Sequence, residues 1–481
     1  MNKKSKVTSF GSQLFTLVGG TLGTYLFPII FAPILTRIYN PQEFSVYTIY
    51  ITIVQIVAII SALKYELGIP LVNNRNERIN LFRISVINTF LISLFVFTIL
   101  SLYDFFNPSS LNMSLLKYFV PTGIILMSMF HHVLYNWLLY KKFFKYISFS
   151  KIVFGFLYAI LPIFLFYSFG FKNYKYLIFS HQVALLVGLF IIFIFICLSR
   201  KELFKDIQSL FIFKIKDLLH VLKKYKKYPL FSSPSQLINV LGIWLPVIMI
   251  WLYFDYKYAS LYFLSHRSVN MPVMLLGHSI GKIFYSEAAS NLNKGRLNES
   301  ISKYFKLLFH LAFPFLFICI FLAPNLFDVV FSKEWSEAGL IVQILSPWLF
   351  VLFIASPLST IPTILYKQEV DFKFNSFLLI VRVFALIVGV FYDSLLLALI
   401  LFSSFSAILW IFYLMYMLKL CGIKTMSLFM NCLNNKYQYL VNIFLILGIY
   451  FFIIDPLHTL ICMIPLLAYL FYSFILELRK V

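Results

Sequence analysis

The chain contains 481 residues, of which 61% are hydrophobic and 12% are charged, and 40 Lys and Arg against 18 Asp and Glu give a formal net charge of +22. This composition excludes a soluble globular domain. The sequence holds about fourteen apolar stretches, and roughly 20 apolar residues suffice for a helix to cross a hydrocarbon core of about 30 Å. Backbone groups in lipid must bond to one another, so we expect an all-α membrane protein.

The predicted spans follow one another along the whole chain. In chain order they are residues 13–35, 44–63, 81–102, 118–140, 152–168, 176–198, 236–254, 259–284, 307–323, 340–365, 377–391, 395–417, 439–454 and 457–476. The first stretch is too long for a cleavable signal peptide and lacks a cleavage-like site, so we expect it to remain as a span.

Basic residues mark one side of the predicted helices. Most Lys and Arg residues lie before the first span, after every even-numbered span and in the tail. The odd-numbered breaks carry only Arg37, Lys117, Lys172, Lys175, Lys257 and Lys333. By the positive-inside rule, both termini are expected to be cytoplasmic and the number of spans even. The net charge is therefore explained by topology, and no nucleic-acid partner is expected.

Residues 199–233 form the longest basic segment. Leu203, Ile207, Leu210 and Leu218 alternate with lysines there, which predicts a helix lying on the inner leaflet against anionic lipid head groups. The segment divides the chain into an N-terminal lobe (1–198, spans 1–6) and a C-terminal lobe (234–418, spans 7–12). Residues 419–481 add two further spans.

The two halves share a weak sequence similarity. Residues 38–47 and 253–262 each contain a short polar turn followed by a small residue and an aromatic one, and each opens a span. This favours a parallel internal repeat, which is typical of transporters whose site lies between the halves.

The eighth span carries the strongest chemical signal. Arg267, Asn270, His278 and Lys282 fall within an arc of roughly 120° at about 100° per residue, so one face of the helix is polar and cationic. Such residues in a span normally face a bundle interior or a wet cavity. A planar guanidinium there suits a phosphate ligand. The alternative is a structural pair with a carboxylate on a neighbouring span.

Other polar positions in the spans are weaker signals. Gln13 in the first span and Asn239 in the seventh lie on stripes of small and polar residues that could line a hydrophilic cavity and bond sugar hydroxyls, or else allow close helix packing. His132 in the fourth span is expected to be a satisfied core group. Arg382 lies near the predicted inner end of its span, where its side chain can snorkel.

Signals for an enzyme are missing from the sequence. There is no Gly-rich phosphate loop before a strand, so ATP is not expected to bind. The five cysteines are scattered without metal-ligand spacing and are expected to be free thiols. Membrane polymerases usually place catalytic groups on long external loops, and the external breaks here are short. We therefore expect no catalytic residue, metal or cofactor.

Several motifs of the chain resemble one family. Residues 35–44 (LTRIYNPQEF) follow the first span, and Tyr65-Glu66 is followed by Ile69-Pro70. Residues 331–339, 345–348 and 356–359 continue the pattern. Together they resemble Wzx-type O-antigen flippases and related polysaccharide exporters. Ser45 and Ser332 depart from this pattern, because a glycine is usual at both positions.

The resemblance implies the fold of the multidrug/oligosaccharidyl-lipid/polysaccharide exporters, with two six-helix lobes facing across a central cavity. It implies a flippase in the bacterial plasma membrane that moves an undecaprenyl-pyrophosphate-linked oligosaccharide from the inner to the outer leaflet by alternating access. Arg267 is then the expected pyrophosphate contact, with Lys282 nearer the cytoplasmic entrance. A polymerase and chain-length machinery of the same pathway are possible partners.

Four further residues are candidates for gating or coupling. Arg37 and Glu43 stand at the outer end of the first two spans, and Glu66 and Glu287 stand near the inner face. Glu66 or His278 could carry protons. The alternatives are a membrane-embedded O-antigen polymerase or ligase, for which paired arginines on a long outer loop would argue, and a drug/cation antiporter of the same fold, for which a carboxylate deep in a lobe would argue.

Overall fold

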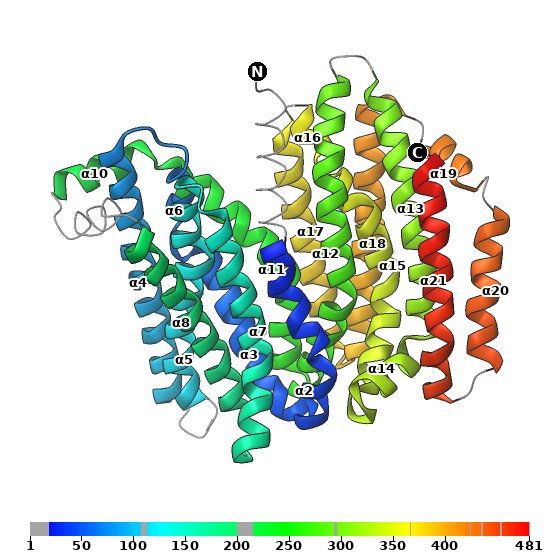
Figure 1. Cartoon of the computed structure of the whole chain (residues 1–481), viewed down its shortest axis with the longest axis horizontal. Helices are drawn as coiled ribbons and strands as arrows, with labels where there is room; N and C mark the ends of the chain where they lie inside the picture. Colours follow the sequence, from blue (N-terminus) through cyan, green and yellow to red (C-terminus); the bar gives the residue numbers. More distant parts are fainter. Residues whose placement is uncertain are drawn as a thin grey trace. The chain divides into compact units, whose positions relative to one another are not determined.

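The computed structural model describes residues 19–106, 113–199, 215–292, 296–365, 367–423, 425–433, 436–452 and 455–480 (Figure 1). Within these residues every regular element is helical, as the apolar sequence requires in lipid. The chain forms two compact units, Met1–Trp244 and Leu245–Val481. The division falls inside helix α11 (Ser233–Tyr253), next to Pro246, which cannot donate a helical hydrogen bond. The lobe boundaries inferred from the sequence remain predictions.

Eleven helices of the described residues are long and apolar enough to cross a membrane. They are Gly19–Ile38, Pro41–Ser61, Arg75–Phe106, Leu115–Tyr140, Phe144–Phe169, Tyr174–Phe195, Tyr228–Tyr253, Leu297–Phe321, Lys333–Leu358, Glu369–Phe391 and Leu395–Leu420. Tyr439–Phe451 and Leu457–Leu470 are shorter apolar helices. The eighth predicted span is also helical, as α12 (Tyr256–Leu292), but it is more polar than the eleven. The chain is therefore a multi-pass membrane protein.

In the first unit, α3 lies at the centre of the helix packing. It contacts α4, α5 and α8, and α7 packs along α8. The elements of this unit are α2 (Ala32–Ile38), α3 (Pro41–Ser61), η1 (Tyr65–Gly68), α4 (Arg75–Phe106), α5 (Met113–Ser128), η2 (Met129–Val133), α6 (Leu134–Tyr140), α7 (Phe144–Phe169), α8 (Tyr174–Ser199), α10 (Ile215–Lys224) and η3 (Tyr228–Ser232).

Helix α3 begins at a complete capping box. The Asn40 side chain accepts from the Glu43 backbone N–H at 2.7 Å, and the Glu43 carboxylate accepts from the Asn40 backbone N–H at 3.1 Å. Pro41 occupies the first turn, where its missing N–H costs nothing. This local chemistry fixes where α3 starts.

Helix α10 lies across the end of α4, as Figure 1 shows. It buries Leu218 and Val221 in a cluster with Tyr65 and Leu81. The Lys224 ammonium bonds the Glu77 carboxylate at 2.6 Å, and Ile215 and Leu219 are exposed. Leu203, Ile207 and Leu210 of the predicted inner-leaflet helix lie outside the described residues.

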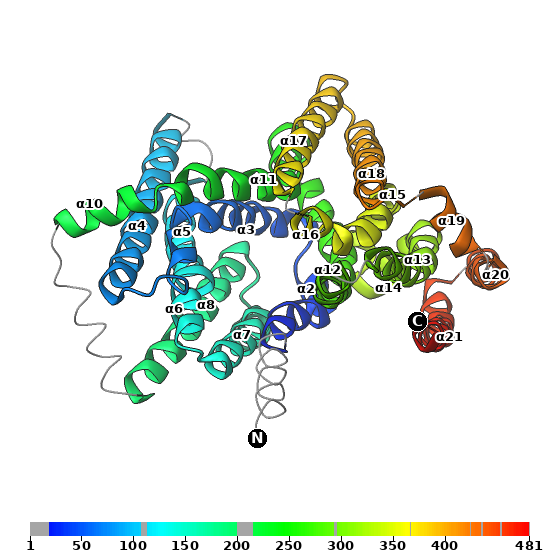
Figure 2. The same ribbon diagram turned by 90° about the horizontal axis from the view of Figure 1, so that it is seen from above.

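In the second unit, α15 is the central helix, in contact with α12, α13, α14 and α18. The remaining elements are α12 (Tyr256–Leu292), α13 (Leu297–Phe321), α14 (Ala323–Phe331), η4 (Lys333–Trp335), α15 (Ser336–Leu358), α16 (Ile361–Ile364), α17 (Gln368–Phe391), α18 (Leu395–Leu420), α19 (Thr425–Leu433), α20 (Lys436–Phe452) and α21 (Pro456–Lys480). Figure 2 shows α19, α20 and α21 at one edge of this unit. A cluster of Ile318, Leu322, Ile446, Met463 and Leu466 joins α20 and α21 to α13.

The packing of the first unit is repeated in the second. The pairs α3–α4, α3–α5, α4–α5, α5–α8 and α7–α8 have their counterparts in α12–α13, α12–α15, α13–α15, α15–α18 and α17–α18. The start of the second helix is also equivalent, because Ser45 Oγ donates to the Gln42 carbonyl at 2.7 Å and Ser260 Oγ to the Lys257 carbonyl at 2.6 Å. Both serines are fully buried. These equivalences support a parallel internal repeat.

Candidate functional site

The polar face of α12 is carried by one uninterrupted helix. Because α12 is α-helical from Tyr256 to Leu292, Arg267, Asn270, His278 and Lys282 share one face at about 100° per residue. Arg267 and Asn270 are half-buried, and the Arg267 guanidinium lies 5.7 Å from the centre of the Phe263 ring. The side chains of His278 and Lys282 lie outside the described residues, as does all of Gln13.

A close approach of two helices fixes the rotation of α12. A Cβ at Gly281 would lie 3.4 Å from Cα of Pro357 on α15, and one at Gly277 would lie 3.7 Å from Cγ of the same proline. At about 100° per residue, Gly277 and Gly281 lie on either side of Asn270, so the edge of the polar face that carries Asn270 packs against α15. Asn239, the other predicted glycan contact, is exposed on α11 in the first unit.

The candidates for the outer gate have local contacts. Arg37 is exposed, and its guanidinium donates to the Pro33 carbonyl at 2.7 Å. Glu43 takes part in the capping box of α3, and its carboxylate lies 3.9 Å from the Lys172 ammonium. The structure thus gives Glu43 a helix-capping role that the sequence analysis did not assign.

The two candidates for the inner gate differ sharply in burial. Glu287 is one-third exposed, accepts a 2.7 Å hydrogen bond from the Tyr304 hydroxyl and lies 3.7 Å from the Lys303 ammonium. This is an ordinary contact between α12 and α13. The Glu66 side chain is only 1% exposed, and its Oε1 lies 3.7 Å from the Lys64 ammonium, which is 6% exposed.

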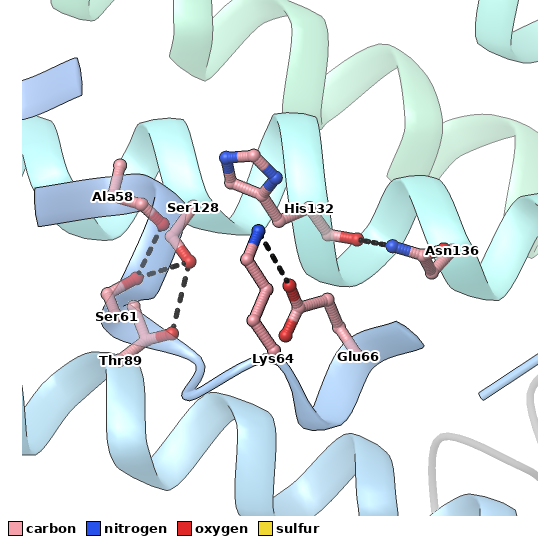
Figure 3. Close-up of polar contacts among 8 residues, drawn as sticks. All are labelled: Ala58, Ser61, Lys64, Glu66, Thr89, Ser128, His132 and Asn136. Atoms are coloured by element: carbon pink, nitrogen blue, oxygen red, sulfur yellow. Dashed lines mark hydrogen bonds and ion pairs between the residues drawn. The ribbon is translucent and has the colours of Figure 1, made fainter. Parts of the chain in front are cut away.

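The Lys64–Glu66 pair is incompletely bonded. A separation of 3.7 Å is longer than a direct hydrogen bond, and Glu66 Oε2 is buried without a hydrogen-bond partner among the described residues. Figure 3 shows the Lys64 ammonium between the Glu66 carboxylate and the His132 ring. A buried carboxylate on η1 and a buried ammonium in the turn before it thus lie near the half-buried imidazole of His132 on η2.

The backbone around this site is unusual on two sides. Leu63 and Lys64 both have positive φ, 51° and 61°, a region that costs a non-glycine residue roughly 1–2 kcal/mol. Opposite them, Met129–Val133 is a π-helix, and such segments are frequent at functional sites. The Asn136 side chain donates to the His132 carbonyl at 2.8 Å inside this distorted region. Two irregular segments therefore meet at one buried ion pair.

Three hydroxyls tie the helices together beside the pair. Ser61 Oγ donates to Ser128 Oγ at 2.7 Å, and Ser128 Oγ lies 3.1 Å from Thr89 Oγ1 (Figure 3). All three residues are fully buried, and they come from α3, α5 and α4. This network holds the end of α3 in place.

The pair lies between two spans, and burial opposes its charge. Burial raises the pKa of Glu66, and the nearby Lys64 ammonium counteracts this only in part. Burial likewise lowers the pKa of Lys64 against the opposing effect of Glu66. Both directions shift the pair toward its neutral forms relative to the same groups in water.

Sequence reasoning identified Glu66 but missed Lys64 and His132. The sequence predicts Lys64 only as a basic residue that follows a span, and His132 only as a core group. The available signal was a lysine and a glutamate two positions apart at the end of a long apolar stretch. Their burial, however, depends on tertiary packing. Among the described residues, no group of three or more His, Cys, Asp or Glu could hold a metal ion.

One sequence-based interpretation is wrong. Arg382 does not snorkel: it is 5% exposed, and its Nε donates to Ser406 Oγ at 2.9 Å. Its guanidinium lies over the rings of Trp348 and Phe402, at 4.7 and 5.0 Å from their centres. The packing of α17 against α18 places this side chain inside the second unit.

Solved structures share the fold of this chain. An inward-facing multidrug resistance MATE family transporter of the MOP superfamily matches with a TM-score of 0.66 and 13% identity, over 85% of this chain and 94% of that one. The lipid II flippase MurJ, in an inward closed conformation, matches with a TM-score of 0.65 and 14% identity, over 98% and 99%. A MOP superfamily transporter from Pyrococcus furiosus gives 0.51 and 14%, over 85% and 94%. No curated protein sequence matches the chain.

These similarities define the class: a multi-pass membrane protein with the fold of MOP-superfamily transporters. The family model described as "polysaccharide biosynthesis protein" matches residues 34–340, which is more than half of the chain. The chain belongs to this family, and the resemblance inferred from its motifs is confirmed.

Proposed function

We propose that this protein is a flippase that moves an undecaprenyl-pyrophosphate-linked oligosaccharide from the inner to the outer leaflet of the bacterial plasma membrane. The observation that carries the proposal is a polysaccharide biosynthesis family match over residues 34–340 on a fold shared with transporters and with a lipid II flippase. The glycan is an O-antigen or similar repeat unit, delivered to the polymerase of the same pathway.

Arg267 is the proposed pyrophosphate contact. It is half-buried on the polar face of α12, where a charged side chain is costly unless it serves a ligand or a partner. A guanidinium can bond two phosphate oxygens at once, which a lysine ammonium does less well. Asn270, His278 and Lys282 extend the same face, and Gln13 and Asn239 are the proposed glycan contacts.

The Lys64–Glu66 pair is the proposed coupling site. Alternating access requires an element that prefers a different protonation or ligand state in each conformation. A buried pair with an unsatisfied carboxylate oxygen, beside strained backbone, has this property. The Glu287 side chain is one-third exposed, so Glu287 is the weaker candidate for a coupling residue near the inner face.

The test is surface glycan display in a strain that lacks the gene. Wild type should restore display, and Arg267→Ala at equal protein level should not, with lipid-linked units accumulating on the inner leaflet. Arg267→Lys should restore display partly. Arg296→Ala, which removes an exposed arginine next to α13, is the matched control and should restore display fully.

The same experiment separates the alternatives. If lipid-linked units reached the outer leaflet of the deletion strain and stayed unpolymerised, a polymerase function would replace the proposal. If glycan display were unchanged by the deletion and drug efflux were lost, the protein would be a drug/cation antiporter of the same fold.

A further inference from the structure

The second unit contains a polar and aromatic core built by four helices. His266 on α12 stacks between Tyr262, at a ring-centre distance of 6.0 Å, and Trp348 of α15, also at 6.0 Å. The Arg382 guanidinium of α17 lies over the Trp348 ring, 4.7 Å from the centre of that ring. Ser406 of α18 accepts the hydrogen bond of Arg382 Nε at 2.9 Å.

This core is inaccessible to bulk solvent. Tyr262, His266, Trp348 and Arg382 are all at most 5% exposed. A charged side chain at such a place inside a membrane bundle is expensive, and it marks a functional site more often than a purely structural one. The proposed transport site does not use it: Arg267, the next residue after His266, points about 100° away around α12.

Two donors of this core have no acceptor within the described ranges of the chain. The Tyr262 hydroxyl and the Trp348 indole nitrogen are buried and have no hydrogen-bond partner among the described residues. A buried donor without an acceptor costs about 1–3 kcal/mol, and a native structure usually satisfies such a group with water or an ion. The Tyr262 hydroxyl also lies within electrostatic reach of the Arg382 guanidinium, although the two are not hydrogen-bonded to each other.

The chemistry of these groups selects the ligand. An indole N–H and a guanidinium can only donate, and a tyrosine hydroxyl readily donates. A ligand that satisfies them must accept hydrogen bonds, and the positive charge of Arg382 favours a negative one. Because these groups are buried between four packed helices, a small ion suits them better than a phosphorylated sugar does.

We propose that the second unit binds a small inorganic anion of halide size next to Arg382 and Tyr262, with Trp348 as a further contact. The site lies within one unit and is distinct from the face of α12 proposed for the cargo. It is independent of the flippase proposal, because binding is measured on the purified protein without any transport.

The experiment is thermal unfolding of the full chain in detergent at constant ionic strength, with chloride or bromide replacing gluconate. Anion binding to the folded state raises the unfolding temperature in a saturable manner. Tyr262→Phe removes only the unpartnered hydroxyl, and we expect it to weaken the apparent halide affinity about tenfold or more. Arg382→Gln should abolish the halide-dependent shift.

Trp410→Phe is the matched control. The Trp410 indole nitrogen is also buried and has no hydrogen-bond partner in the described part of the chain, but its ring packs against Phe374 and Tyr413 rather than Arg382. This variant should keep the wild-type halide response, whereas Trp348→Phe should weaken it. An unsaturable response in wild type, or one that Tyr262→Phe and Arg382→Gln leave unchanged, would overturn the proposal. If Arg382→Gln does not fold, Tyr262→Phe decides the outcome alone.

Discussion

The Lys64 ammonium lies 3.7 Å from the Glu66 carboxylate at the end of α3, and both side chains are almost completely buried. Taking two charges out of water costs several kcal/mol per ion, and their attraction offsets this only when the remaining donors and acceptors are satisfied. Here Glu66 Oε2 is not satisfied among the described residues. The pair is therefore a weak source of stability, which agrees with the coupling role proposed for it.

Replacing Lys64 alone should destabilise the protein in a pH-dependent manner. Lys64→Met leaves Glu66 as an uncompensated buried charge, which typically costs about 3–5 kcal/mol at neutral pH. Because burial raises the pKa of Glu66 above its ordinary value of 4.5, the protonated form is favoured in the folded state. In this variant the stability that protonated Glu66 contributes is present at acid pH. It is lost as the pH rises through the pKa that Glu66 has in the folded state.

Thermal unfolding between pH 5 and 8 measures this effect. The deficit of Lys64→Met relative to wild type should shrink toward pH 5. The double variant Lys64→Met/Glu66→Gln should recover most of the stability at every pH, because no buried charge remains. A deficit of Lys64→Met that is equal at both ends of this range would contradict the argument.

Glu66 and Glu287 should differ in their effect on function. Glu66→Gln keeps the shape of the side chain but removes the ability to change charge, so we expect loss of surface glycan display with normal amounts of folded protein. Glu287→Gln replaces a carboxylate that is already one-third exposed, and it should reduce display by no more than about twofold, since exposed ion pairs contribute little. Equal loss in both variants would place the inner coupling site elsewhere.

The membrane class could be predicted from the sequence because apolar length and helical backbone are linked in lipid. Each predicted span has a helix among the described residues, although α4 extends beyond both ends of its predicted span of 81–102. The helix continues into polar residues beyond the apolar stretch, and hydropathy does not detect these residues as part of the helix. Hydropathy therefore locates a helix better than it locates the ends of the helix.

The chemistry of individual positions was less predictable. Arg382 was assigned to the interface from its place along the chain, yet the packing of α17 against α18 buries it beside Ser406. In the sequence, Lys64 resembles any basic residue that follows a span. In the structure, Leu63 and Lys64 have positive φ and Lys64 is buried. In both cases tertiary contacts, not local propensity, determine what the charge does.

Two glycines should respond oppositely to alanine. A Cβ at Gly389 of α17 would lie 2.2 Å from Cβ of Ala398 on α18, whereas nothing lies within 4 Å of one at Gly448 on α20. Gly389→Ala should separate α17 from α18 and destabilise the protein by about 1–3 kcal/mol. Gly448→Ala should be neutral or stabilising by up to about 1 kcal/mol, because alanine favours the helix. Thermal unfolding of the two variants side by side measures the difference, and similar temperatures would refute this close packing.

The capping box of α3 offers a way to separate structure from gating at Glu43. Asn40→Ala removes the acceptor for the Glu43 backbone N–H and should cost about 1 kcal/mol. Gln42→Ala, at an exposed position in the same turn, should be nearly neutral. If Glu43 acts only in the cap, Glu43→Gln should preserve most of the stability and the glycan display, because Gln also completes a capping box. Loss of display in Glu43→Gln with unchanged unfolding temperature would instead assign the Glu43 charge to transport, where its 3.9 Å contact with Lys172 is the first partner to test.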